Sequence, residues 1–240
     1  MSLDFALEAL NKILAVLPTT LMLFIFSVLL GLVFALIVLW MRMSSNRLLS
    51  GIAKTYIFIF RGTPLLIQIF LIFYGLAQFQ FMKESLFWLV LKNRIASAVF
   101  VMALCTAAYQ AEILRGGLLA VSTKEIEAAR AIGMSGFKLL YRIIAPIALR
   151  QALPAYSTEV ILTLKSTSLA GLIGVVEMTG IAQKIGRQAL LDVPVLALAG
   201  IIYIALSYVI IFLLGLAERQ LSPHLRFMPP SAQTPRTIVG

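Results

Sequence analysis

The chain has 240 residues, of which 61% are hydrophobic and only 12% are charged. Soluble domains are on average roughly 45–50% apolar and about 25% charged, so a soluble fold of this size could not cover so much apolar surface. The high hydrophobicity also argues against an intrinsically disordered chain. In a soluble domain the net charge of +10 would indicate nucleic-acid binding, but in a membrane protein basic loops and anionic lipid headgroups explain it. We therefore expect a lipid bilayer as partner and no nucleic acid.

The single cysteine and the single histidine limit the possible chemistry. Cys105 lies in an apolar run and cannot form a disulfide within the chain, so its expected role is that of a small packed side chain. His224 lies in a polar tail, and the several ligands that a catalytic zinc site needs do not assemble in this sequence. We expect no metal site.

Five stretches of the sequence are long and apolar enough to cross a bilayer, which requires roughly 20 helical residues. The expected spans are about 16–40, 55–79, 94–118, 153–176 and 194–217. The amino end is not typical of a signal peptide, because it carries Asp4 and Glu8 instead of a basic cluster and the first apolar run is too long. The expected fold class is all-α integral membrane, with one transmembrane domain over residues 1–220.

The distribution of basic residues indicates how these spans are oriented. The loops on one side of the expected spans carry twelve Lys and Arg residues, and the loops on the other side carry six. Because cytoplasmic loops are enriched in Lys and Arg, the richer side is expected to be cytoplasmic. The amino terminus is then outside and the carboxyl terminus inside, where residues 221–240 form a flexible, proline-containing tail.

Several ionisable residues fall in or near the apolar stretches, where they are costly unless they are paired or reach a water-filled cavity. Arg61 precedes Gly62 and Pro64, which weaken the second span. Arg61 therefore either reaches the cytoplasmic edge beside a structural kink or belongs to a gate. Glu159 is the better candidate for holding a cationic substrate, because it lies deeper than Glu112.

Glu112 and a set of hydroxyl side chains each have two interpretations. Glu112 either contacts a substrate or forms an ion pair with Arg115 three residues on, and we favour the ion pair. Thr163, Ser166 and Thr167 either bind a substrate or bond back to their own helix, which is the more common case. The candidate substrate-pathway residues are Arg61, Thr63, Tyr109, Glu112, Glu159, Ser166 and Thr167.

The stretch 122–146, between the third and fourth spans, predicts two short helices on the cytoplasmic side. Ser122 or Thr123 can cap a first helix that has Glu125 in its first turn. Gly133 can take the left-handed conformation that ends this helix.

The second helix of this loop is expected to be amphipathic. Ser135 can cap it, Phe137 and Tyr141 lie on its apolar face, and Pro146 is expected to bend or end it. The two helices either lie on the lipid surface or form a protrusion that fits a groove of a partner protein.

The residue spacing in this loop favours the second interpretation. It resembles the EAA loop of the membrane subunits of bacterial ABC importers, with the pattern E-A-A, three residues, G, nine residues and I-x-L-P. The sequence has Glu127-Ala128-Ala129, then Gly133, Ile143 and Pro146, with Ala145 where the family usually has Leu. The resemblance implies that Glu127, Ala128, Ala129, Gly133, Ile143 and Pro146 couple the chain to an ATPase.

Further motifs place the resemblance among the permeases of polar amino-acid importers, close to the histidine/lysine/arginine and the octopine or nopaline types. Arg61-Gly62-Thr63-Pro64 is typical of these permeases. The segment 165–169 resembles K-D-T-S-L with Ser166 in place of Asp, and the segment 109–117 also resembles the family. The likeness covers roughly residues 15–220.

The resemblance implies a transporter that depends on partner proteins. No G-x-x-x-x-G-K-[ST] pattern occurs in the sequence, so we expect ATP and Mg²⁺ in a partner ABC ATPase dimer, with no cofactor and no enzymatic activity in this chain. A second permease subunit, identical or homologous, and a periplasmic amino-acid-binding protein complete the expected assembly in the bacterial inner membrane. Its substrates would be polar, basic amino acids or opine-like derivatives.

Two rival functions belong to other classes. A self-sufficient secondary transporter or channel for small polar solutes would need no partner-docking loop, and it often shows internal repeats that we do not find here. An intramembrane enzyme would need a nucleophile with its base at bilayer depth, for which the neighbours Lys165 and Ser166 are the only indication.

Overall fold

The computed structural model describes residues 2–221, which are mostly helical and contain no strand, so the all-α prediction is confirmed for these residues. The tail expected at 221–240 lies outside the described residues apart from its first residue. In the first half of the chain the α-helices are α1 (Leu3–Ala15), α2 (Leu17–Met43), α3 (Arg47–Gly62), α4 (Leu65–Phe70), α5 (Gln80–Lys83), α6 (Trp88–Leu91) and α7 (Arg94–Leu119). In the second half they are α8 (Thr123–Ala131), α9 (Gly136–Leu139), α10 (Ala145–Ser166), α11 (Met178–Ala189) and α12 (Asp192–Leu221). The 3₁₀ and π segments are η1 (Leu71–Gly75), η2 (Leu76–Gln78), η3 (Leu140–Ile144) and η4 (Thr167–Ile173).

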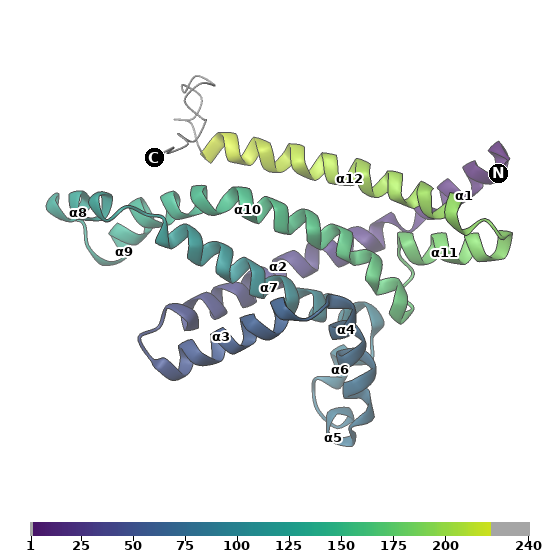
Figure 1. The fold of residues 1–240 in the computed structure, drawn as a ribbon, viewed down its shortest axis with the longest axis horizontal. Coiled ribbons are helices and arrows are strands. Elements are labelled where there is room, and N and C mark those ends of the chain that lie inside the picture. Colours follow the sequence, from purple (N-terminus) through teal and green to yellow (C-terminus); the bar gives the residue numbers. More distant parts are fainter. Residues whose placement is uncertain (1, 222–240) are drawn as a thin grey trace, which may run out of the picture.

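Helix α7 lies at the centre of the molecule and packs against α2, α3 and α10 (Figure 1). Small residues make this packing close. Gly31 of α2 faces the backbone of Ala103 and the side chain of Thr106, and Gly117 of α7 faces the backbone of Ala148 in α10. Within a bilayer, helix association depends on such van der Waals contact, because apolar residues gain nothing by leaving lipid for one another.

The chain turns sharply between α3 and α4, where the bend is 107°. Pro64 has no backbone N–H to continue a helix, and it forces the preceding Thr63 into an extended conformation with φ −116° and ψ 145°. The second expected span, 55–79, is therefore not one continuous helix. It consists of the end of α3 and, after the break, of α4, η1 and η2.

The loop 122–146 has the expected helix ends. Ser122 caps α8 in a capping box with Glu125, and Gly133 is left-handed with φ +83°. Pro146 does not end a helix, which was one of the two expected outcomes. It lies in the first turn of α10, where a missing N–H is tolerated, and the π segment η3 joins α9 to α10 so that the helix continues from Gly136 to Ile173.

The chain after α10 bends a second time, by 51° between η4 and α11. Gly174 is left-handed there with φ +80°, and the buried Glu177 caps α11. Helix α11 packs its buried Met178 and Ala182 against α1 and α12, around Ile13 and Val195. The sequence had not indicated α11 as a separate helix.

Among residues 2–221, three helical stretches are long and apolar enough to cross a membrane, namely Leu3–Met43, Arg94–Leu119 and Asp192–Glu218. The two bent pairs raise the number to five if each pair forms one span. Large apolar side chains of α12, such as Phe212, are exposed on the outer surface, which is the arrangement expected of a helix that faces lipid.

Candidate functional site

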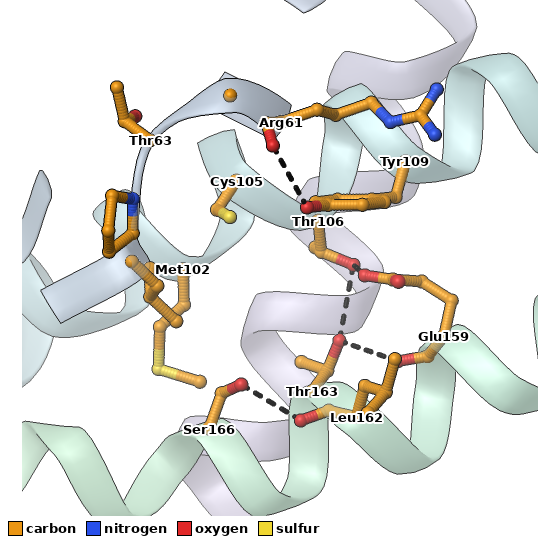
Figure 2. A pocket seen from close by; sticks show the side chains of 13 residues that line it. Arg61, Thr63, Met102, Cys105, Thr106, Tyr109, Glu159, Leu162, Thr163 and Ser166 are labelled. Atoms are coloured by element: carbon orange, nitrogen blue, oxygen red, sulfur yellow. Dashed lines mark hydrogen bonds between the residues drawn. The ribbon is translucent and has the colours of Figure 1, made fainter. Parts of the chain in front are cut away.

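A cavity of about 470 Å³ lies where α3, the break that follows it, α7 and α10 meet (Figure 2). The cavity is lined by Arg61, Gly62, Thr63, Pro64, Leu65, Met102, Cys105, Thr106, Tyr109, Glu159, Leu162, Thr163 and Ser166. Both long helices present one face to it. The α7 residues follow the spacing i, i+3, i+4, i+7, and so do the α10 residues, which is the period of one helical face.

A buried polar cluster forms one wall of the cavity. Glu159 is only 8% exposed, and its carboxylate oxygen Oε1 accepts a hydrogen bond of 2.7 Å from the hydroxyl of Thr106. The hydroxyl of Thr163 lies 3.2 Å from that of Thr106 and donates to the Glu159 carbonyl at 3.0 Å. Gln110 donates to Thr106 from the next turn of α7 at 3.4 Å. The contacts hold the carboxylate in place and leave its second oxygen without a protein donor among the described residues.

Arg61 and Tyr109 also line the cavity, next to this cluster. The guanidinium carbon of Arg61 lies 5.1 Å from the centre of the Tyr109 ring, a cation–π geometry. The Tyr109 hydroxyl donates to the Arg61 carbonyl at 3.5 Å, so side chain and backbone of Arg61 both contact the same tyrosine. In Figure 2 the ring of Tyr109 lies between the Arg61 guanidinium and the Glu159 carboxylate. The cavity is therefore lined by both a cation and an acid, which complements a solute that carries both charges.

The structure brings five of the seven candidate pathway residues to this cavity: Arg61, Thr63, Tyr109, Glu159 and Ser166. Ser166 bonds back to the Leu162 carbonyl at 2.9 Å, which is the alternative that the sequence favoured. Thr167 is fully buried outside the cavity, and its hydroxyl donates to the Leu164 carbonyl and lies 3.1 Å from the Tyr203 hydroxyl.

Glu112 lies outside the cavity and is held by two arginines. One carboxylate oxygen lies 2.7 Å from Arg115, and the other lies 3.3 Å from Arg42 at the end of α2. The predicted ion pair with Arg115 is thus confirmed. Because its charge is neutralised within the fold, Glu112 ties α2 to α7 and is not positioned to meet a solute in this cavity.

Met102, Cys105, Thr106 and Leu162 line the cavity but were not predicted as site residues. The signal that could have found them is the helical spacing from Tyr109 back to Thr106, Cys105 and Met102. In a membrane chain that spacing is hard to use, since apolar side chains occupy lipid-facing and buried faces alike.

The loop between α7 and α10 forms a second candidate site, at one end of the molecule in Figure 1. Glu127 and Ala128 of α8 are exposed, whereas Ala129 is buried against the fold. Large apolar side chains are exposed on the same loop, namely Ile132, Phe137 and Tyr141, and the last two stack with ring centres 6.1 Å apart. Exposed apolar groups beside a left-handed glycine turn are typical of a protein-docking surface.

Residues 27–223 match the family model described as binding-protein-dependent transport system inner membrane component. The chain is 47% identical to the nopaline transport system permease protein NocM of Agrobacterium fabrum over 227 residues, which is 94% of each chain. It is 38% identical to the histidine/lysine/arginine/ornithine permease HisM of Escherichia coli over 208 residues, 86% of this chain and 87% of the relative. It is 33% identical to the arginine permease ArtM of Haemophilus influenzae, over 92% of this chain and 96% of the relative.

Solved structures share the fold. The chain superposes on a chain of the crystal structure of an amino acid ABC transporter with histidines with a TM-score of 0.79 and 31% identity, over 92% of this chain and 100% of the other. It also superposes on a chain of the inward-facing MetNI methionine ABC transporter with a TM-score of 0.67 over 92% of this chain and 99% of the other. The identity there is 19%, so that likeness shows the fold alone.

Proposed function

The chain belongs to the binding-protein-dependent transport system inner membrane components, and on this basis we propose that it carries basic amino acids or opine-like derivatives through the cavity between α3, α7 and α10. It is a permease subunit of an ABC importer. Relatives named for nopaline, octopine, arginine and histidine transport support this substrate class.

The observation that carries the proposal is the buried carboxylate of Glu159 in a cavity that Arg61 also lines. A guanidinium or ammonium group of the solute would bind the free oxygen of Glu159, and a solute carboxylate would bind Arg61. Charged hydrogen bonds of this kind are stronger than neutral ones, so both ends of a zwitterion contribute to recognition. Tyr109 would stack on the solute or release Arg61 to meet it.

We further propose that an ABC ATPase dimer docks on the loop 122–146 and supplies the energy. The exposed side chains of Ile132, Phe137 and Tyr141 would fill a groove of the ATPase, while Glu127 and Gly133 set the position of α8. ATP and Mg²⁺ would bind in that partner. Closure of the dimer would then move the loop as a rigid body and shift the helices between inward-open and outward-open states.

The topology and the remaining partners belong to the same proposal. We infer five spans, with the amino terminus periplasmic and the loop 122–146 cytoplasmic, in the bacterial inner membrane. Lys165 supports a second permease subunit, since it is exposed on α10 within an expected span and makes no ion pair with the described residues. A cation facing lipid at this depth is costly, so a protein surface would cover it. A periplasmic binding protein would deliver the solute.

Uptake by the purified complex in proteoliposomes tests the substrate site, with L-arginine, octopine and nopaline as probes. We expect Glu159→Gln to raise the KM for the transported probe roughly 10- to 100-fold, because a charge-assisted hydrogen bond is lost. Glu84→Gln removes an exposed carboxylate that does not line the cavity and is the matched control.

Two outcomes would contradict the proposed function. An unchanged KM in Glu159→Gln would remove the carboxylate from recognition. Uptake at full rate by the chain without ATP and without any ATPase would favour a secondary transporter or channel instead.

A further inference from the structure

The break between α3 and α4 leaves backbone carbonyls that need partners. The last carbonyls of a helix have no N–H of the same helix to bond, and a bilayer offers no water in their place. The Ile59 carbonyl is satisfied by Thr63, whose N–H and hydroxyl donate to it at 3.1 and 2.8 Å. The carbonyls of Phe60 and Thr63 both accept from one side chain that lies beyond the break.

That side chain is Gln68, which lies in α4 and is only 6% exposed. Its amide nitrogen Nε2 lies 2.9 Å from the Phe60 carbonyl, 3.0 Å from the Thr63 carbonyl and 2.9 Å from the Thr63 hydroxyl. Because the two carbonyls only accept hydrogen bonds, the donor end of the amide must face them. One side chain thus bridges the end of α3, the break and α4.

The acceptor end of the same amide shows that Gln68 is not simply a packing residue. Its oxygen Oε1 is buried and has no hydrogen-bond partner among the described residues. A buried polar atom without a partner is destabilising, and an apolar side chain of the same size would avoid that cost. All hydrogen bonds of the Gln68 side chain with the described residues are thus made by its donor end.

Gln68 does not line the cavity, but the residues that it holds do. Arg61 lies between the two carbonyls that Gln68 bonds, Thr63 carries one of them, and both residues line the cavity. The same stretch of backbone is contacted from α7, where Tyr109 donates to the Arg61 carbonyl and the Cys105 sulfur lies 3.9 Å from the Phe60 carbonyl. Figure 2 shows Cys105 beside this stretch and Thr63 at the turn. The backbone around Arg61 is thus held from two sides, by α7 and by Gln68.

We propose that Gln68 is a positioning residue for solute recognition, whose amide fixes the break at Gly62–Pro64 and thereby places Arg61 and Thr63 around the cavity. This role rests on the proposed function of the cavity. It makes the shape of the solute site depend on a side chain that touches no solute.

The native thiol provides a direct readout, because Cys105 is the only cysteine of the chain and lies in the cavity wall. The rate at which N-ethylmaleimide alkylates Cys105 in the purified complex is followed by mass spectrometry of its peptide. The rate is measured at increasing concentrations of L-arginine, octopine and nopaline, and the concentration of half protection reports solute binding. Gln68→Met keeps the volume and removes the donor, and Gln78→Met at an exposed position is the matched control.

We expect at least one probe to protect Cys105 in the unaltered complex. In Gln68→Met, the concentration of half protection should rise roughly tenfold, the effect of losing about one net hydrogen bond, and the unprotected thiol should react faster. Gln78→Met should change neither quantity. Gln68→Glu keeps the size and polarity without the amide donor and should shift protection in the same direction, which guards against a folding defect peculiar to the methionine variant.

The outcomes separate this inference from the proposed function. Protection of Cys105 at the same concentration in the unaltered, Gln68→Met and Gln68→Glu complexes would overturn the positioning role and leave the cavity as the solute site. Absence of protection by all three probes in the unaltered complex would overturn the solute site itself, and with it the role of Gln68.

Discussion

Glu177 and Glu159 are both buried, but the groups around each carboxylate give it a different role. Glu177 is fully buried, and its oxygens accept from the Thr179 and Gly180 amides at 2.8 and 2.6 Å and from the Tyr203 hydroxyl at 3.1 Å. All of these donors are groups of the chain itself. The two N–H groups let Glu177 cap α11, and the tyrosine hydroxyl links that helix to α12. Glu159 has fewer protein donors and faces a cavity, which is why it is the candidate for binding a solute.

Adjacent glycines in α7 provide a test of close packing at the scale of single residues. A Cβ on Gly117 would overlap the Ala148 carbonyl, whereas a Cβ on Gly116 would meet nothing within 4 Å. We expect Gly117→Ala to destabilise the complex by about 1–3 kcal/mol through overpacking. Gly116→Ala should be neutral or stabilising by up to about 1 kcal/mol, since alanine favours a helix.

Thermal unfolding of the purified complex gives the melting temperatures of the two alanine variants and so compares their stabilities. Equal melting temperatures for the two would show that α7 and α10 do not pack as closely as described.

At the scale of elements, the breaks and caps matter more than the helices they separate. The loop 122–146 is held by local signals, namely the capping box at Ser122 and Glu125 and the left-handed Gly133. Gly133 and Gly136 both have positive φ, of +83° and +51°, and among the described residues nothing lies within 4 Å of a Cβ built at either. At both positions it is therefore the backbone conformation, and not crowding, that disfavours other residues.

The backbone requirement at Gly133 predicts an ordered series of variants. Valine is strained at positive φ and should lower solute-stimulated ATP hydrolysis by roughly tenfold, because the strain of about 1–2 kcal/mol displaces α8. Asparagine tolerates the left-handed conformation and should retain most of the stimulation. ATP hydrolysis by the reconstituted complex, with and without solute, gives the comparison. If valine and asparagine behaved alike, the geometry of this turn would not be what couples the subunits.

At the scale of the whole molecule, the two ends of the fold correspond to the two expected sides of the membrane. In Figure 1, α8 and α9 lie towards one end, while the N-terminus and α11 lie towards the other. The end with α8 and α9 carries the loop with the largest share of the basic residues, which is the end expected in the cytoplasm.

Labelling from outside the cell tests this orientation. Lys124 in α8 and Glu84 after α5 are both exposed, and we predict that they lie on opposite sides of the membrane. In cells whose outer membrane has been made permeable and whose inner membrane is intact, a thiol reagent that cannot cross the inner membrane should label Glu84→Cys but not Lys124→Cys. After permeabilisation of the inner membrane it should label both. Labelling of Lys124→Cys while the inner membrane is intact would reverse the proposed orientation.

The sequence by itself determined the class of the molecule and much of its local structure. Composition alone indicated a membrane protein, and the ends of α8 followed from Ser122, which caps its start, and Gly133, which follows its end. The motif around Glu127 identified the family, which the match over residues 27–223 then showed. These features could be predicted because each depends on residues close together in the chain.

Only the tertiary structure decided which residues share a site. Thr106 and Glu159 are 53 positions apart, and their hydrogen bond exists because small residues bring α7 and α10 together. In a membrane chain, hydropathy does not distinguish a face turned to lipid from a face turned to the core, since both are apolar. The same limit hid Gln68, whose partners lie across a 107° bend within a stretch that the sequence predicted as one span weakened at Gly62 and Pro64.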